Sequence, residues 1–330
     1  MTKQQGRACN SDFKPASGLS NPHLQTLWPF LFRHQPRMAL RRERLELADG
    51  DFIDLDWYVP PVAVNTKGLC ILLHGLEGDS QSHYIPALMQ KLAMQGWRTL
   101  LMHFRGCGGE HNRLARGYHS GDTADFNEVL MQLLQREQPS RTAAIGFSLG
   151  GNVLLKYLGE QGSQTSLNAA VAVSVPFELA AGADRLACGF SRIYQWWLIR
   201  SLQRKLYDKF SRHLSAGECP LPLRELKQQK TFYQFDNTIT APLHGFADVH
   251  DYYTQSSSRQ YLPDIRCSTL ILHALDDPFL SPIAIPADSE LSTSTRLEIS
   301  THGGHVGFVG GTFRQPEYWL DSRICQYLAD

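Results

Sequence analysis

Hydrophobic residues along this chain follow two alternating patterns from residue 68 onward, continuous apolar runs and helical repeats. Continuous apolar runs are typical of strands that are buried on both faces of a sheet. They occupy residues 68–73, 99–102, 142–145, 169–175 and 268–274, and we expect residues 296–300 to form the last strand. Apolar positions three or four residues apart predict helices at 85–95, 122–136 and 318–328. Strands alternating with helices predict an α/β chain with a mostly parallel central sheet and helices on both faces.

Residues 1–40 show neither pattern and are expected to be irregular, and we place the N-terminal arm at residues 1–43. An apolar, aromatic patch at 27–32 lies within it. We expect this patch to pack on the body of the protein, with membrane contact as the alternative. Residues 45–57 then alternate in polarity around an Asp-Gly turn, which predicts a β-hairpin at the start of the main domain, residues 44–330.

Residues 177–262 interrupt the alternation, because they carry helical signals and no strand pattern. Apolar side chains recur every four residues from Tyr194 to Leu214, which predicts one stripe of a long helix. Asp208 is the only acid among the basic residues that accompany it: Arg192, Arg200, Arg204, Lys205, Lys209 and Arg212. We expect a helical insertion that packs over the functional edge of the sheet as a lid. A basic amphipathic helix that meets anionic lipid is a second interpretation, compatible with the first.

Composition and charge exclude several classes of function. The 32 basic and 32 acidic side chains give a formal net charge of zero, so no broad basic field is available for nucleic acid. No apolar run is long enough to predict a transmembrane helix, and the first residues lack the apolar segment of a signal peptide. The seven cysteines include no Cys-x-x-Cys pair and are expected to be reduced thiols. We therefore expect a cytoplasmic protein.

The motif Gly-Phe-Ser-Leu-Gly-Gly-Asn at 146–152 carries the clearest chemical signal. It lies between a predicted strand and a helical pattern that begins at Val153. A sharp strand-to-helix turn leaves no room for side chains at the flanking glycines and lifts the serine clear of the sheet. The motif predicts Ser148 as a nucleophile at the positive end of a helix dipole.

A serine nucleophile needs a base and a carboxylate that orients the base. His305 follows the last predicted strand in a glycine-rich loop and is the preferred base, with His302 as its competitor. The acid is expected in the pair that follows the strand at 268–274. We favour Asp276 because it leaves the strand first, and Asp277 is the alternative. No cysteine or carboxylate stands at ligand spacing beside the two histidines, so we expect neither a metal nor an organic cofactor.

An oxyanion hole requires two backbone amides. Leu149, directly after the serine, is expected to supply one, and Leu76, in the His-Gly-Leu-Glu-Gly loop at 74–78, the other. His74 in the same loop is expected to be structural. The nucleophile, acid and histidine each follow a predicted strand and occur in the order Ser, Asp, His, which predicts an α/β-hydrolase fold.

Further motifs along the chain resemble those of one family. They are Asn-Pro-His-Leu-Gln-Thr-Leu at 21–27, His-Phe-Arg-Gly-Cys-Gly-Gly-Glu at 103–110, Asp-Tyr-Tyr at 251–253, Asp-Asp-Pro-Phe at 276–279 and His-Gly-Gly-His-Val-Gly-Phe at 302–308. Together with the loops at 74–78 and 146–152, they resemble the YheT-like hydrolases of the α/β-hydrolase superfamily over nearly the whole chain. The resemblance implies a charge relay of Ser148, one of the paired aspartates and His305, with carboxylic-ester hydrolase activity. It also implies a leaning towards lipid esters among eukaryotic members.

Three functional interpretations remain open at the level of the sequence. The first is an ester hydrolase that works through an acyl-enzyme, and the second is an acyltransferase in which an alcohol replaces water. The third is a non-catalytic binding protein on a hydrolase fold. The expected partner is a small-molecule ester, lipid esters included, with peripheral membrane contact through the lid as a further hypothesis.

Overall fold

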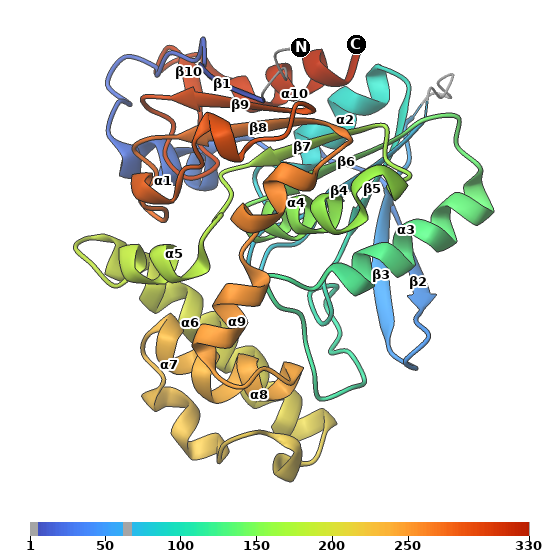
Figure 1. Ribbon diagram of the computed structural model, residues 1–330, viewed down its shortest axis with the longest axis vertical. Helices are drawn as coiled ribbons and strands as arrows, with labels where there is room; N and C mark the ends of the chain where they lie inside the picture. The colour runs from blue at the N-terminus through green and yellow to red at the C-terminus, as the bar shows by residue number, and fades with distance from the viewer. Residues whose placement is uncertain (1–5, 62–67, 330) are drawn as a thin grey trace.

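A nine-stranded sheet forms the centre of the protein in the computed structural model, which describes residues 6–61 and 68–329 (Figure 1). The strand order is β1-β9-β8-β7-β6-β4-β5-β3-β2. The β2–β3 hairpin and the β3–β5 pair are antiparallel, and the other neighbours in this sheet are parallel, so the predicted α/β architecture is confirmed. The strands are β1 Arg7–Asn10, β2 Leu40–Glu46, β3 Phe52–Tyr58, β4 Gly68–Leu73, β5 Trp97–Met102, β6 Thr142–Phe147, β7 Ala169–Val173, β8 Ser268–Ala274 and β9 Thr295–Ser300, with β10 Val309–Gly311 and β11 Pro316–Tyr318 in a separate small sheet.

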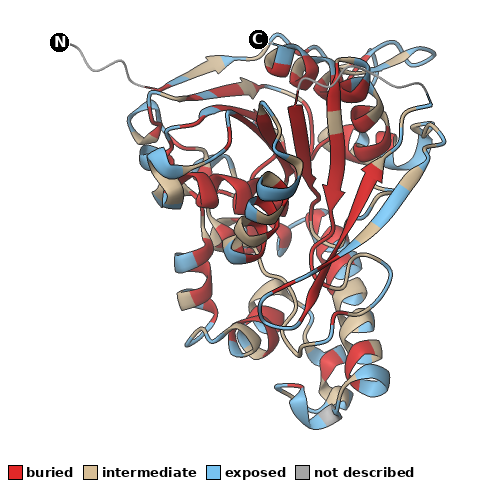
Figure 2. Ribbon diagram, turned by 90° about the vertical axis from the view of Figure 1, so that its right-hand side faces the viewer, coloured by how far each residue is buried: buried red, intermediate tan, exposed pale blue. Residues whose placement is uncertain are grey.

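Helices cover both faces of the sheet because successive side chains of a strand point to opposite sides. In β4, Leu69 and Ile71 belong to one apolar core, and Cys70 and Leu72 belong to the other. Figure 2 shows the central strands buried along their length, as two-sided packing requires. The first core is covered by α3 (Thr123–Glu137) and α4 (Leu149–Gln161), and the second by α2 (Ile85–Met94) and α10 (Trp319–Ala329).

A helical layer, here called the cap (residues 177–262), connects β7 to β8 and lies beyond one end of the sheet (Figure 1). Every residue of the cap is described, and none belongs to a strand. Its own apolar cluster includes Ile199, Leu226, Phe235 and Ile239, so the cap is a packed layer. Its helices are α5 Leu179–Leu186, α6 Ser191–Asp208, α7 Phe232–Phe235, α8 Ala241–His244 and α9 Val249–Ser256, joined by π-helical turns at Lys209–His213 and Asp236–Thr240 and by 3₁₀ turns at Ala216–Glu218, Leu223–Gln228 and Arg259–Asp264.

The helix predicted through residue 214 is shorter in the structure, because α6 ends at Asp208 and a π-helical turn follows. Lys209, the first residue of that turn, is buried. Its ammonium group donates to Asn112 Oδ1 at 2.8 Å and to the carbonyl oxygens of Ala115 and Arg116 at 3.2 and 3.0 Å. These contacts fix the end of α6 to a loop of the core.

The N-terminal arm is more regular than its sequence pattern predicts, and the expectation of an irregular arm was wrong for two segments. Residues 7–10 form β1 at the edge of the sheet, paired with β9, and Pro22–Phe32 form α1. The Asn21 side chain accepts hydrogen bonds from the amides of His23 and Leu24 at the start of α1. An asparagine followed by proline is a recognised helix start, so the sequence did contain this signal.

The aromatic patch at 27–32 is only partly packed. The Trp28 ring lies 4.6 Å from that of Phe32 and 4.7 Å from that of Phe313, measured between centroids. Phe30 and Leu31 are 60% and 61% exposed, so the expected packing of the patch holds for only part of it. Among the described residues, no helix combines the length and the apolar character needed to cross a lipid bilayer.

Candidate active site

Ser148 occupies the sharp turn between β6 and α4 that the sequence predicts. Its backbone has φ 50° and ψ −117°, a conformation that non-glycine residues rarely adopt. Its amide donates to the carbonyl oxygen of Val173 at 2.8 Å, which anchors the turn to the neighbouring strand β7. The side chain is thereby held at the carboxyl end of the sheet, beside the first turn of α4.

The glycines around Ser148 are required by close backbone packing. A Cβ atom on Gly146 would lie 2.4 Å from the carbonyl oxygen of Gly150. One on Gly150 would lie 2.5 Å from the carbonyl oxygen of His74. Backbone atoms cannot yield at such distances, so the predicted steric reason for both glycines is confirmed.

The structure brings His305 between Ser148 and one carboxylate. His305 Nε2 lies 3.0 Å from Ser148 Oγ, and its Nδ1 lies 2.8 Å from Asp277 Oδ2. Both nitrogens of the ring are therefore occupied by the two partners that a nucleophile–base–acid relay requires. His302, the competing histidine, instead contacts Asp276, with its Nδ1 3.3 Å from Oδ2.

The carboxylate in contact with His305 is Asp277, whereas the sequence argument favoured Asp276, and this preference needs correction. After β8 the chain turns back, and the Asp277 amide donates to the carbonyl oxygen of Ala274 at 3.3 Å. The turn directs the second aspartate, not the first, towards the histidine. Asp277 is 2% exposed and also accepts from the Phe279 amide at 2.8 Å.

Asp276 has a separate set of contacts in the same loop. Its Oδ1 accepts from the Gly304 amide at 3.0 Å, next to His305 in the chain. Burial raises the pKa of Asp276, and the Gly304 amide and His302 oppose that shift. Asp276 therefore fixes the loop that carries His305 and does not reach its ring.

The N-terminal helix α1 buttresses the His305 loop, a role that the sequence did not reveal. The His305 amide donates to Thr26 Oγ1 at 2.9 Å, and that hydroxyl donates to the carbonyl oxygen of Pro22 at 2.8 Å. A Cβ atom on Gly307 would lie 2.2 Å from the carbonyl oxygen of Gln25. The motif at 21–27 and the glycine-rich loop thus fit each other, although about 280 residues separate them. The His305 ring also stacks on Phe279 with centroids 4.1 Å apart.

Two unpaired amides lie beside Ser148, at the positions predicted for an oxyanion hole. Within the part of the chain that the structure describes, neither the Leu76 nor the Leu149 amide has a hydrogen-bond acceptor. A Cβ atom on Gly75 would lie 3.3 Å from Ser148 Cβ, so the loop at 74–78 closely approaches the serine. The amides on either side of Leu76 are occupied by tyrosine hydroxyls, Gly75 by Tyr84 and Glu77 by Tyr118, each at 2.9 Å.

His74 has the structural role expected of it. Its Nδ1 contacts the carbonyl oxygen of Gly75 at 2.7 Å, and its Nε2 accepts from the Phe104 amide at 3.1 Å. Burial and the neighbouring His103 lower the pKa of His74 to about 3, so the ring is neutral at physiological pH. It connects the loop at 74–78 to the loop after β5.

A polar network connects the cap to the same loop. Lys205 of α6 donates to Glu77 Oε1 at 2.9 Å, and Ser201 donates to Glu77 Oε2 at 3.2 Å. The Tyr118 hydroxyl donates to Glu77 Oε1 at 2.9 Å while it accepts from the Glu77 amide. Lys205 Nζ also lies 2.9 Å from Cys107 Sγ, a thiol whose pKa burial raises to about 11. The side chains of α6 therefore hold the residue next to the Leu76 amide.

A largely apolar cavity of about 750 Å³ opens onto Ser148 and His305. Its walls come from three parts of the chain: the core, α1 and the cap. The volume lies within the range of small-molecule binding sites. The apolar side chains that line it include Leu27, Phe30, Leu76, Leu179, Ala183, Leu186, Ile193, Trp197, Leu198, Leu202 and Phe235.

Two clusters among the described residues have the composition of a metal site, namely His111, Asp208 and His213, and His119, Asp122 and His244. In each the carboxylate is already paired with an arginine, Asp208 with Arg212 at 2.9 Å and Asp122 with Arg116 at 2.7 Å. A neighbouring guanidinium opposes a second cation, so neither cluster supports a metal centre. His302 and His305 belong to neither cluster.

Residues 69–312 match the family described as the alpha/beta hydrolase fold. The chain belongs to this family. It is 43% identical over 319 residues to YheT of Escherichia coli, a protein provisionally named an esterase, with 97% of this chain and 93% of YheT covered. The resemblance to YheT-like hydrolases is therefore confirmed.

More distant relatives and solved structures agree with this family. The mouse phospholipase ABHD3 is 29% identical over 311 residues, which cover 92% of this chain and 75% of ABHD3. The Pyrococcus furiosus esterase Pf2001 aligns with a TM-score of 0.56 at 15% identity over 98% of both chains. At that identity the likeness shows the fold alone.

Proposed function

We propose that this member of the hydrolase family cleaves carboxylic esters through an acyl-enzyme formed on Ser148. The observation that carries the proposal is the unbroken contact chain from Ser148 Oγ to His305 Nε2 and from His305 Nδ1 to Asp277. Such a chain increases the nucleophilicity of a serine, because the histidine accepts its proton as the oxygen attacks. The family membership and the esterase name of YheT support the same reaction class.

A residue of the site can be assigned to each step of acylation and deacylation. His305 takes the hydroxyl proton as Ser148 Oγ bonds to the ester carbonyl carbon, and the Leu76 and Leu149 amides donate to the resulting oxyanion. His305 then returns the proton to the leaving alcohol as the ester bond breaks. Water enters, gives a proton to His305 and attacks the carbonyl carbon of the acyl-enzyme. His305 then returns that proton to Ser148 Oγ as the bond between this oxygen and the acyl carbon breaks, which releases the acid and restores Ser148. Asp277 stabilises the imidazolium in both halves of the reaction.

The cavity supports the proposal that the preferred ester carries an apolar acyl group. Its aliphatic and aromatic walls favour burial of hydrocarbon next to Ser148. The name of ABHD3 also supports a lipid ester, since that relative is a phospholipase. We propose that the cap acts as the lid of this site and that it contacts a membrane surface where lipid esters reside. The seven free cysteines support a further proposal, that the protein works in the reducing cytoplasm.

A chain-length panel of p-nitrophenyl esters from two to sixteen carbons tests both parts of this proposal. We expect hydrolysis with kcat/KM that rises with acyl length until the cavity is filled, and no hydrolysis above background for Ser148→Ala. Glycerol in the assay distinguishes acyl transfer, because a transferase would form the glycerol ester in preference to the free acid. Equal rates for wild type and Ser148→Ala would disprove the assignment of the nucleophile.

A further inference from the structure

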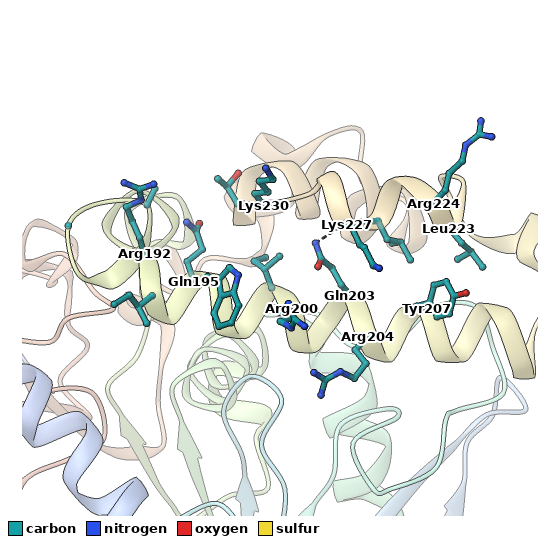
Figure 3. Close-up of a pocket in the computed structure, with 17 residues that line it drawn as sticks. Arg192, Gln195, Arg200, Gln203, Arg204, Tyr207, Leu223, Arg224, Lys227 and Lys230 are labelled. Carbon is teal, nitrogen blue, oxygen red and sulfur yellow. Dashed lines mark hydrogen bonds between the residues drawn. The ribbon is translucent and has the colours of Figure 1, made fainter.

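A second cavity lies on the outer side of α6, away from Ser148 (Figure 3). It is a groove of about 1440 Å³ between α6 and the segment at 223–231. Figure 3 shows Lys227 pointing into the space between the two walls and Gln203 reaching across it to the opposite segment, whereas Arg204 and Arg224 point away from that space. Gln203 Nε2 donates to the carbonyl oxygens of Leu226 and Gln229 at 2.8 and 2.7 Å, which fixes the two walls relative to each other. The groove is therefore a built feature of the cap.

The groove is lined by cations without matching anions. Among the described residues, no aspartate or glutamate lines it. Within the described chain, Arg224 has one ion pair, with Glu225 at 3.7 Å, and the other basic side chains of the groove have none. The basic residues are Arg192, Arg200, Arg204, Arg224, Lys227 and Lys230. Because the chain as a whole has equal numbers of acids and bases, this local excess of positive charge marks a site for an anion.

Apolar side chains from both walls also line the groove. Trp196, Ile199, Leu223 and Leu226 line it between the cationic side chains. A ligand that satisfies both features has a hydrocarbon part and an anionic group, as a phospholipid does. A soluble anion such as a sugar phosphate would leave these apolar side chains uncovered.

The apolar surface continues from the groove to the mouth of the active-site cavity. Ile193 and Trp196 line both cavities and are 53% and 58% exposed. Trp197 is 53% exposed, and its ring lies 6.1 Å from that of Phe30 in α1, which is also exposed. Exposed apolar patches of this kind on a protein with buried cores mark a contact surface.

From these observations we propose that the groove binds the headgroup phosphates of anionic phospholipids in a bilayer. The exposed side chains Phe30, Ile193, Trp196 and Trp197 then enter the interface beside the mouth of the catalytic cavity. Tryptophan at the headgroup level and basic residues that contact phosphates are the usual components of such binding. The substrate would pass from the bilayer to Ser148 without crossing water. This proposal rests on the proposed function only for the identity of the substrate as a lipid ester.

Vesicle flotation with the full chain tests the proposal. Wild type should partition onto vesicles of equal phosphatidylcholine and phosphatidylglycerol at least about tenfold more than onto phosphatidylcholine alone. Arg192→Glu/Arg200→Glu/Lys227→Glu should lower that binding about tenfold or more. The matched control is Arg7→Glu/Arg141→Glu/Arg266→Glu, which changes the net charge equally at the opposite, amino-terminal edge of the sheet and should keep binding within about twofold. Thermal melts verify that both variants are folded.

Several results would overturn the proposal. The first is equal binding of wild type to neutral and anionic vesicles. The second is an equal loss of vesicle binding in the groove variant and the control variant. The third is absence of vesicle binding together with saturable binding of glycerol phosphate or a glutamate-rich peptide. Ser148→Ala measured in the same assay separates this proposal from the enzymatic one. It should bind anionic vesicles like wild type although it hydrolyses no ester. Wild type that binds these vesicles but hydrolyses no ester would contradict the proposed function and leave the docking surface supported.

Discussion

The carboxyl edge of the sheet and the outer face of the cap hold their charged groups in opposite ways. At the sheet edge, Asp277 is buried and shared between His305 and the Phe279 amide, and Asp276 is held by His302 and the Gly304 amide. On the outer face of the cap, exposed basic residues such as Arg192 and Lys227 have no anionic partner among the described residues. Satisfied groups keep one geometry, which catalysis needs, whereas unsatisfied exposed charges are available to a partner.

The α6 helix shows the same contrast on its two sides. Lys205 faces the core and is bound to Glu77 and Cys107. Burial lowers the pKa of Lys205, but Cys107 and Glu77 outweigh that effect and raise it, so this lysine stays charged. Arg200 lines the outer groove, and its guanidinium carbon lies 5.5 Å from the centroid of the Trp196 ring. One helix therefore contacts the loop at 74–78 on one side and presents exposed cations to the groove on the other.

The largest expected effect is the difference in kcat/KM between alanine variants of the two histidines at the sheet edge, His305 and His302. His305→Ala should lower kcat/KM for a soluble ester by about 10⁴-fold, because His305 is the one described residue whose side chain is hydrogen-bonded to Ser148 Oγ and can accept its proton. His302→Ala should lower it by less than about tenfold, since the His302 ring is hydrogen-bonded to Asp276 and not to Ser148. Steady-state kinetics on both variants measure the difference, and a reversed order would exclude His305 as the base.

The two aspartates give the next comparison. Asp277→Asn should lower kcat by about 10³-fold or more, because an amide fixes the histidine in the wrong tautomer. Asp276→Asn keeps the shape of the loop and should lower kcat by less than about tenfold. Comparable losses in the two variants would show that the acid is shared between them or assigned wrongly.

The choice between these aspartates illustrates what the sequence alone could not decide. Buried strands and the glycines around Ser148 follow local rules, since apolar runs and steric fit depend on near neighbours in the chain. The acid depends on one turn after β8, in which a shift of a single residue exchanges the two carboxylates. The contact of Thr26 with the His305 loop depends on packing between distant segments, for which a single sequence contains no direct signal.

A smaller effect is expected from the link between cap and oxyanion loop. Lys205→Met should lower kcat by roughly tenfold with little change in KM, because Glu77 loses the cation that positions it next to Leu76. In a Glu77→Gln background the same substitution should have a much weaker effect, because the two residues act as a pair. Additive losses in the double variant would show that Lys205 acts elsewhere.

The smallest expected effect concerns stability and pH. Asp236 of the cap is held by Thr240 and Tyr253 hydroxyls, and burial raises its pKa to about 6. The folded state therefore binds this proton more tightly than the unfolded state, so its contribution to stability is full below about pH 4 and is lost as pH rises to about 6. Asp236→Asn should raise the melting temperature at pH 8 by a few degrees and have little effect at pH 4. A gain of equal size at both pH values would contradict the assigned pKa.

The central claim is that Ser148 is the residue that becomes acylated. Incubation with a fluorophosphonate, followed by intact-mass measurement and peptide mapping, tests it most directly. We expect a single adduct on Ser148 in wild type, no adduct in Ser148→Ala, and strongly slowed labelling in His305→Ala. An adduct on another residue, or equal labelling of wild type and Ser148→Ala, would contradict this account.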